Sequence, residues 1–337
     1  MIKLMRNKTR PARFFRTALA AAFFAFIAVV FGAYTRLSEA GLGCPEGPAC
    51  VGRAIAPGAA QDAINKRPTS PRAWKDMAAR YVAGGLGILL LRLFVLGWQL
   101  RRRPGQQVLI PSITFLLVFG LTAMSVFTID LQYKPLVMMT QFLGSLLVLA
   151  LLWWIVLRQQ RIFPSVASTP LTRSLRPRAF AALLLVLLAI ALGGWSMVNY
   201  AAAACPDFPT CQGDYWANAD LEAGLFGWQA DGLAYDRSEL TLSAAAAIQF
   251  AHRIGGFLVV LYLGWLSLHL LRVGIQENLC RYGLLLLVMI SFATALGIMA
   301  AVGGLELPTG VGHSVVAAML LLSTVTLYHV LRAPRSS

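Results

Sequence analysis

The amino-acid sequence predicts an all-α polytopic membrane protein. Hydrophobic residues make up 58% of the 337 residues and charged residues only 13%, a balance far from that of a soluble domain. The apolar residues gather in runs of about 20, long enough to cross the hydrocarbon core of a bilayer as helices. The net charge of +15 comes from short basic clusters between these runs. That pattern is typical of cytoplasmic loops and not of a nucleic-acid-binding surface, so we expect no nucleic-acid partner.

Eight membrane-spanning helices are predicted, one for each apolar run. The runs comprise residues 14–35, 77–100, 107–129, 135–157, 178–199, 244–271, 281–302 and 308–331. An even number of crossings puts both termini on one side of the membrane, and the basic clusters predict that this side is the cytoplasm. Residues 36–75 and 200–243 then form two long outer segments, and residues 158–177 form a cytoplasmic linker.

An internal repeat divides the chain into two halves. The segments that repeat are Gly32–Gly52, with the sequence GAYTRLSEAGLGCPEGPACVG, and Gly193–Gly213, with the sequence GGWSMVNYAAAACPDFPTCQG. The shared pattern CP-x-x-P-x-C-x-G recurs at a constant offset (205 − 44 = 161). Such a repeat predicts a tandem duplication of four helices with parallel topology. We assign residues 1–165 to the N-terminal half and residues 166–337 to the C-terminal half.

Four of the five cysteines lie in the predicted outer segments as two C-x5-C pairs. The space outside a bacterial inner membrane is oxidising, so the sequence favours two local disulfides, Cys44–Cys50 and Cys205–Cys211. A redox-active dithiol is the alternative. A zinc site is disfavoured because no histidine lies near either pair in the sequence.

Two histidines lie at matched depth in the predicted helices of the C-terminal half. His252 lies roughly 12 Å along its helix from the outer surface, and His313 lies roughly 8 Å along another helix that enters from the same face. A neutral imidazole inside a membrane is costly unless it has a partner, and two at one depth suit the two axial positions of a haem iron. The sequence therefore predicts a haem between His252 and His313, with Arg253 placed to pair with a haem propionate.

The other two histidines lie near the opposite ends of the same helices. His269 follows His252 by 17 residues and His329 follows His313 by 16, which turns the helix by roughly 260° and 160°. Neither lower histidine therefore shares a face with its upper partner. We expect both to be interfacial residues with polar tips near the lipid headgroups.

The chain resembles the haem A synthase family, eight-helix membrane enzymes of cytochrome oxidase assembly. The residues that carry the resemblance are Thr35-Arg36-Leu37, Gly41-Leu42, Asn199-Tyr200, the segment from Cys205 to Gly213, His252-Arg253, and His313 after Leu307-Pro308. The resemblance covers nearly the whole chain. It implies oxidation of a methyl group of haem O to the formyl group of haem A, in two successive steps. It also implies a haem b held by His252 and His313, through which electrons pass.

The N-terminal half departs from the family pattern. The family's substrate half carries a Glu-x-x-His-Arg motif, which aligns here with Asp76-Met77-Ala78-Ala79-Arg80, and a further histidine, which aligns with Gln141. All four histidines of the chain lie in the C-terminal half. Alanine cannot bind iron, and a glutamine carbonyl is a poor haem ligand.

Two interpretations follow from this departure. In the first the chain is an enzyme: Asp76 performs the carboxylate chemistry, Arg80 and Arg36 hold propionates, and the substrate iron is unligated or weakly held by Met138, Met139 or Tyr81. In the second the N-terminal half is catalytically silent, and the protein is a haem-handling, electron-transfer or oxidase-assembly factor. The resemblance further implies a bacterial inner-membrane location. The partners it implies are haem O and haem A, haem O synthase, cytochrome c oxidase subunits and further copies of the chain.

Overall fold

In the computed structural model helices are the only regular elements among the described residues, apart from one isolated bridge between Cys211 and Asp214. The described residues are 2–41, 71–102, 108–127, 134–159, 163, 166–214, 219–232, 235, 240–273, 278–303 and 306–332. Seven helices in these ranges are long and apolar enough to cross a membrane, and an eighth apolar helix, Leu109–Met124, is shorter. The fold class predicted from the sequence is therefore confirmed.

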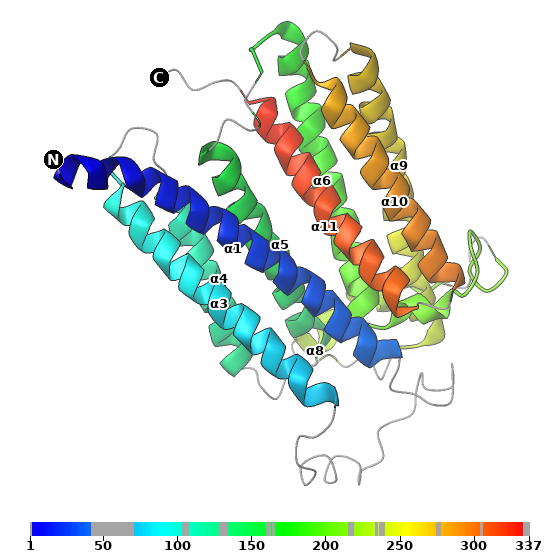
Figure 1. The fold of residues 1–337 in the computed structure, drawn as a ribbon. Coiled ribbons are helices and arrows are strands. Elements are labelled where there is room, and N and C mark those ends of the chain that lie inside the picture. The colour runs from blue at the N-terminus through cyan, green and yellow to red at the C-terminus, as the bar shows by residue number, and fades with distance from the viewer. Residues whose placement is uncertain are drawn as a thin grey trace.

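The long helices follow the predicted apolar runs. They are α1 (Ile2–Gly41), α3 (Pro71–Gln99), α4 (Leu109–Phe127), α5 (Pro135–Gln159), α6 (Pro170–Val198), α9 (Leu242–Val273), α10 (Cys280–Val302) and α11 (Leu307–Val330). Helix α1 begins and helix α11 ends at one end of the bundle (Figure 1). We call it the arginine-rich end because α6 begins there beside Arg173, Arg176 and Arg178. The opposite end carries the short helices η3 (Ala201–Ala204), α7 (Leu221–Phe226) and α8 (Trp228–Asp231), and we call it the loop end.

The linker predicted for residues 158–177 is shorter in the structure, because α6 begins at Pro170 and not at residue 178. Thr169 caps the helix: its hydroxyl accepts from the Thr172 N–H at 3.2 Å, and its own N–H donates to the Thr172 hydroxyl at 2.9 Å. Pro170 at the first helical position needs no N–H donor. This cap starts the helix early enough to include Pro177, which costs one backbone hydrogen bond.

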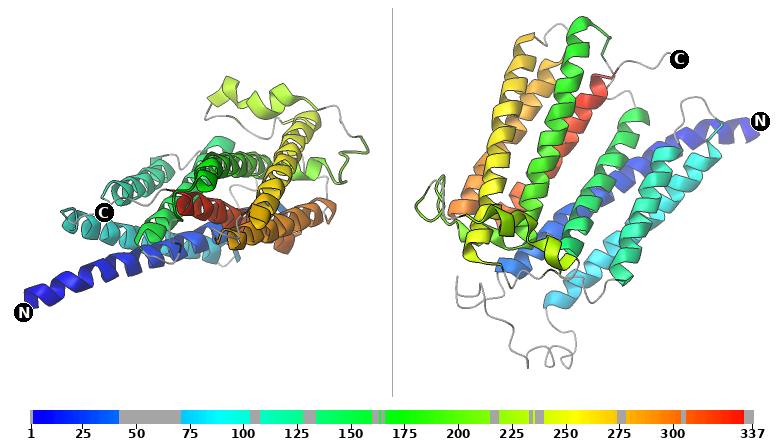
Figure 2. Two further views of the ribbon diagram at one scale, coloured as in Figure 1. Left: turned by 90° about the horizontal axis from the view of Figure 1, so that it is seen from above. Right: turned by 180° about the vertical axis from the view of Figure 1, so that it is seen from behind.

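The helices pack as two rings of four. In one ring α1 packs on α3 and α5, and α4 closes the ring between α3 and α5. In the other ring α6 and α10 each pack on both α9 and α11. The rings meet where α1 and α5 contact α11, and where α5 contacts α6 (Figure 2). Helices at opposite corners of a ring therefore face each other across its interior.

Large apolar side chains on the outer surface fit a lipid environment. Phe23, Phe257 and Phe292 are each more than half exposed, as are Ile88 and Leu116. In water such an apolar surface would be a liability, whereas in a bilayer it contacts acyl chains. The interior is also apolar, with one core cluster that runs through both rings.

A polar contact between described residues crosses from one ring to the other. The Trp153 indole N–H on α5 donates to the Thr326 hydroxyl on α11 at 2.9 Å. We expect Thr326→Val to lower the free energy of unfolding by about 1 kcal/mol, because it removes the acceptor while keeping the side-chain shape. Thermal unfolding of the purified protein measures the change.

The matched control is Thr324→Val, because the Thr324 hydroxyl donates only to the Leu321 carbonyl of its own helix at 2.8 Å. Trp153→Phe combined with Thr326→Val should cost less than the sum of the single variants. Strictly additive losses would contradict the inter-ring contact.

Candidate functional site

The candidate site lies inside the ring of α6, α9, α10 and α11. His252 is on α9 and His313 is on α11, and these helices stand at opposite corners of the ring. Their imidazole ring centres are 6.2 Å apart and the ring planes are nearly perpendicular, at 83°. The structure thus brings together the two histidines that the sequence predicts as a pair.

Two glycines on the other pair of helices make room for the imidazoles. A Cβ atom at Gly193 of α6 would lie 2.7 Å from Cε1 of His252, and one at Gly297 of α10 would lie 3.0 Å from Cε1 of His313. Contacts this close are not tolerated between ordinary side chains. Each imidazole therefore packs directly against the backbone of a neighbouring helix.

The hydrogen bond of His313 fixes which of its nitrogens can bind a metal. Nδ1 lies 2.9 Å from the Ala293 carbonyl oxygen. A carbonyl can only accept, so Nδ1 carries the proton and Nε2 keeps a free lone pair. Histidines that bind metals in proteins are commonly oriented in this way by a carbonyl on the other nitrogen.

His252 has an unsatisfied polar atom in the ring interior. Its Nδ1 is buried and forms no hydrogen bond of good geometry among the described residues, although the Ala189 backbone of α6 lies close enough to interact with the imidazole. A buried polar atom without a partner costs free energy.

The spacing of the imidazoles fits a shared haem iron. An imidazole nitrogen lies about 2 Å from a metal that it binds, and the ring centre lies about 1 Å beyond, so two axial imidazoles place their ring centres about 6 Å apart. The observed 6.2 Å agrees with this value. The donor set is also suitable, because two neutral imidazoles are common axial ligands of haem.

A second polar pair lies one turn nearer the loop end. The Ser196 hydroxyl donates to Oε1 of Gln249 at 2.7 Å, and both residues are buried. Gln249 precedes His252 by three residues, and Ser196 follows Gly193 by three, so this bond fixes α9 against α6 beside the imidazole. Sequence reasoning missed the pair. The sequence did contain a signal for the pair, because Ser196 and Gln249 are polar residues in apolar runs and Gln249 lies one turn from His252.

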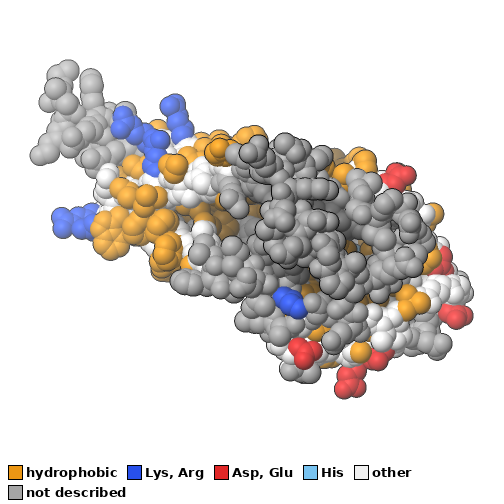
Figure 3. Space-filling model, turned by 90° about the horizontal axis from the view of Figure 1, so that it is seen from below, with side chains coloured by type: hydrophobic (Ala, Val, Ile, Leu, Met, Phe, Trp, Pro, Cys, Tyr) orange, Lys and Arg blue, Asp and Glu red, His pale blue; other side chains and the backbone are white. Residues whose placement is uncertain are grey.

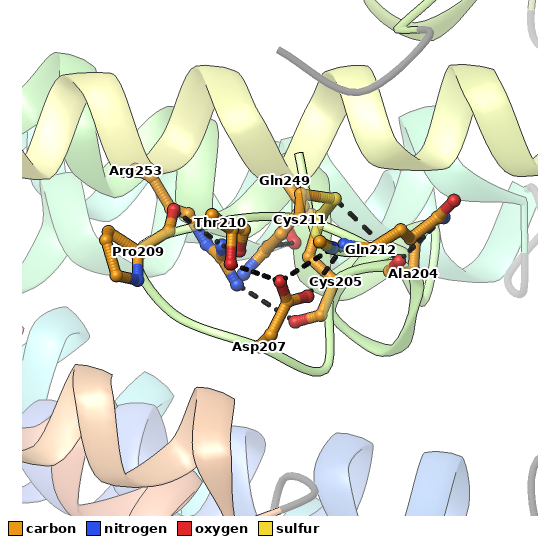
Figure 4. The surroundings of a disulfide bond; sticks show 11 residues. Ala204, Cys205, Asp207, Pro209, Thr210, Cys211, Gln212, Gln249 and Arg253 are labelled. Carbon is orange, nitrogen blue, oxygen red and sulfur yellow. Dashed lines mark hydrogen bonds between the residues drawn. A yellow bond between two sulfur atoms is a disulfide. The ribbon is translucent and has the colours of Figure 1, made fainter. Parts of the chain in front are cut away.

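Arg253 is held by the loop that the Cys205–Cys211 disulfide closes. Its guanidinium donates to the Cys205 carbonyl at 2.9 Å and to the carbonyls of Thr210 and Pro209 (Figure 4). The disulfide predicted between Cys205 and Cys211 is present. The guanidinium Nε is buried and has no hydrogen-bond partner among the described residues. Arg253 thus lies on the loop side of His252 and still has one donor to offer.

A small apolar cluster covers the loop end of this ring. It contains Trp195, Val198, the two disulfide cysteines and Tyr235. The Trp195 indole N–H donates to the Gly224 carbonyl of α7 at 2.9 Å. The outer segment predicted as a loop therefore contains short helices that pack onto α6 and α9.

The N-terminal ring is described in part. Asp76 and Arg80 lie in α3, but their side chains are outside the described part of the structure, and the predicted Cys44–Cys50 pair is wholly outside it. Arg36 of α1 lies with its guanidinium carbon 5.6 Å from the centre of the Phe142 ring of α5. The structure thus places Arg36 between α1 and α5, near the loop end.

Two of the suggested weak iron ligands point away from the N-terminal ring. Met138 and Met139 pack against the apolar cluster at the loop end of the other ring. The sulfur of Met139 would lie 3.1 Å from a Cβ at Gly194 of α6. Tyr81, the third suggestion, is 73% exposed.

The two lower histidines lie near the arginine-rich end and do not face each other as a pair. His269 receives a hydrogen bond from the Arg178 guanidinium at 3.3 Å, and its ring stacks on Trp265. His329 meets Trp154 edge to face, with ring centres 5.3 Å apart. Each therefore has polar or aromatic neighbours of its own.

Comparison with known proteins gives matches that span both rings. Residues 15–325 match the model of the COX15-CtaA family, described as cytochrome oxidase assembly protein. The chain is also 33% identical to the heme A synthase of Shewanella oneidensis over 323 residues, which are 93% of this chain and 95% of that protein. The chain belongs to the family of cytochrome oxidase assembly proteins. The resemblance predicted from the sequence is confirmed, and within this family the match includes the N-terminal ring as well as the histidine-bearing ring.

The disulfide loop of this family member is built around a carboxylate. Asp207 accepts hydrogen bonds from the Thr210 hydroxyl, from the Gly213 N–H at 3.0 Å and from the Gln212 N–H at 2.7 Å. These bonds, chiefly the one from Thr210, lower the pKa of Asp207 to about 2. Because the pKa is lower in the folded loop than in the unfolded chain, the carboxylate stabilises the loop above about pH 4. That stabilisation is lost as the pH falls through 2.

We expect Asp207→Asn to speed the reduction of the Cys205–Cys211 disulfide by a phosphine at pH 4 to 7, because the loop loses its charged acceptor. The difference from wild type should shrink as the pH falls from about 4 to 2. Alkylation of the released thiols, followed by peptide mass spectrometry, reports this disulfide separately. A variant-to-wild-type rate ratio that stays constant over the whole pH range would contradict the assigned role of the carboxylate.

Proposed function

We propose that this chain binds haem b between His252 and His313 and oxidises the methyl group of haem O to a formyl group, as a haem A synthase. The observation that carries the proposal is the pair of opposed imidazoles, 6.2 Å apart on helices at opposite corners of one ring. Membership of the cytochrome oxidase assembly family and the similarity to a heme A synthase support the reaction.

Each residue of the histidine-bearing ring has a role in this proposal. Bound haem b would supply one-electron redox chemistry. His252 and His313 would hold the iron. Gly193 and Gly297 have no side chain and so let each imidazole pack against the backbone of the neighbouring helix. The Nε–H of Arg253, which is buried without a partner among the described residues, is the donor for a propionate.

The N-terminal ring would receive the haem substrate. Gly32 is the repeat counterpart of Gly193 (193 − 161 = 32). A Cβ at Gly32 would meet no described atom within 4 Å, whereas one at Gly193 would meet His252 at 2.7 Å. The position equivalent to Gly193 is therefore less closely packed in this ring. In the proposal Asp76 acts as the carboxylate acid or base, and Arg36 and Arg80 bind propionates.

The distribution of charge supports an inner-membrane orientation with both termini in the cytoplasm. Described arginines crowd the arginine-rich end, including Arg101, Arg102 and Arg158. Described carboxylates gather at the loop end, as Figure 3 shows. Positive charge favours the cytoplasmic side, so the disulfide loop would face outward.

The haem b proposal predicts that His252→Ala and His313→Ala each lose most of the bound haem, because each variant removes one of the two residues that would hold the iron. The measurement is the Soret absorbance of the purified protein, with haem extracted to identify its type. His269→Ala and His329→Ala are matched controls on the same two helices and should keep the wild-type haem content. A wild-type protein without a Soret band would refute the site.

A finer pair of variants serves as a further control. Gly193→Ala adds a methyl group against the imidazole of His252 and should lower haem content, whereas Gly32→Ala adds one in open space and should not. Both changes raise helix propensity equally. Equal losses in the two variants would point to a general folding defect.

A second candidate function is a catalytically silent homologue that handles haem, transfers electrons or assists oxidase assembly. The observation that favours it is the absence of imidazole from residues 1–165. The family's substrate-half histidines align with Ala79 and Gln141, which cannot supply comparable iron ligands.

Haem A formation separates the two functions. We expect haem A to accumulate when the chain is produced with a haem O synthase in cells that lack their own haem A synthase. Extracted pigments are identified by chromatography and mass spectrometry. Asp76→Asn should lower the ratio of haem A to haem O at least tenfold if the carboxylate acts as an acid or base. If cells that produce the wild-type chain contain haem O and no haem A, the result supports the catalytically silent function.

A further inference from the structure

An apolar groove lies between α6 and α9 on the lipid-facing side of the histidine-bearing ring. Its volume is about 340 Å³, and its lining residues are Leu185, Leu258, Leu261, Tyr262 and Trp265. Leu261 and Trp265 are each about half exposed, at 54% and 47%. The right-hand view of Figure 2 shows the two helices side by side along this face. Because both helices belong to the membrane-spanning set, whatever fills the groove comes from the bilayer.

A fixed arginine closes the groove at the arginine-rich end. The guanidinium carbon of Arg178 lies 5.6 Å from the centre of the Trp265 ring, and the Tyr262 hydroxyl donates to the Arg178 carbonyl at 3.1 Å. The guanidinium also donates to Nε2 of His269 at 3.3 Å, and the His269 ring stacks on Trp265 with an angle of 8° between the planes. These contacts hold one cation where the apolar lining ends.

The positive charge around Arg178 is not balanced by a carboxylate on α6 or α9. Arg173 and Arg176 on α6 and Arg272 on α9 are exposed at the same end. Neither α6 nor α9 contains an aspartate or a glutamate. A basic patch at the membrane interface, directly beside an apolar groove, complements an anionic headgroup with an acyl chain attached.

We propose that this groove is a binding site for an anionic phospholipid. One acyl chain lies along Leu185, Leu258 and Leu261, and the phosphate accepts hydrogen bonds from the Arg178 guanidinium. A soluble anion would not fill the apolar part, and a neutral lipid would leave the arginines without a counter-charge. The site lies at the opposite end of the ring from Gln249 and Arg253, and it is separate from the His252–His313 pair.

The test compares lipid binding to the purified, delipidated full-length protein. Phosphatidylglycerol and phosphatidylcholine with identical acyl chains are added in equal amounts, and bound lipids are counted by native mass spectrometry. Wild type should prefer phosphatidylglycerol. Arg178→Gln should weaken that preference about fivefold, as expected for the loss of one interfacial cation.

Two further variants make the result specific. Leu261→Trp fills the groove while leaving Arg178 in place, and should reduce binding of both lipids. Arg101→Gln is the matched control, because Arg101 also lies at the arginine-rich end over a tryptophan, with its guanidinium carbon 4.9 Å from the Trp98 ring centre. That control should keep the wild-type preference. Equal binding of the two lipids by wild type, or an equal effect of Arg101→Gln and Arg178→Gln, would overturn the proposal.

Discussion

The constraint on which the histidine-bearing ring depends is that two polar imidazoles lie inside an apolar bundle. A polar side chain in a membrane-spanning helix is costly without partners, so the protein must supply each imidazole with space and with partners. Space comes from Gly193 and Gly297, where any larger residue would collide with an imidazole. The Ala293 carbonyl orients His313, and the Ser196–Gln249 bond fixes the helix pair next to His252. These requirements account for most of the polar and small residues in this part of four otherwise apolar helices.

The two rings share one arrangement of helices but differ in what fills them. In the C-terminal ring, helices at opposite corners carry histidines that meet at the centre. In the N-terminal ring, α3 and α5 stand at the equivalent corners. The family resemblance leads us to expect histidines on these two helices, but Ala79 and Gln141 occupy the positions. The two rings therefore share one packing arrangement but differ in the side chains at equivalent corners. This difference is why geometry points to a candidate site only in the histidine-bearing ring, and why the proposed reaction must be tested by its product.

Sequence alone predicted the fold class because the membrane imposes one simple rule, an apolar run of about 20 residues for each crossing. It predicted helix ends less well. Nothing in hydropathy marks Pro170 as the start of α6, because that start depends on the Thr169–Thr172 cap. Short helices α7 and α8 were missed for a related reason: they are too short to be stable alone and depend on contacts such as the one between Trp195 and Gly224.

Only those residues of the candidate site whose type is unusual in an apolar run could be predicted from the sequence. His252 and His313 stand out because histidine is rare in apolar runs. Gly297 does not, since 29 glycines occur in the chain and only tertiary packing shows which one faces an imidazole. The partners of Arg253 were equally hidden, because they are carbonyl oxygens, which every residue carries.

Arg253 connects the disulfide loop to the helix that carries His252. Its guanidinium is bonded to three loop carbonyls, and its backbone is the next residue after His252. The loop is therefore linked to α9 at the residue next to one imidazole. Evolution can adjust this link by changing loop residues without altering the histidine itself. Relatives with different loops could differ in the properties of the same buried site.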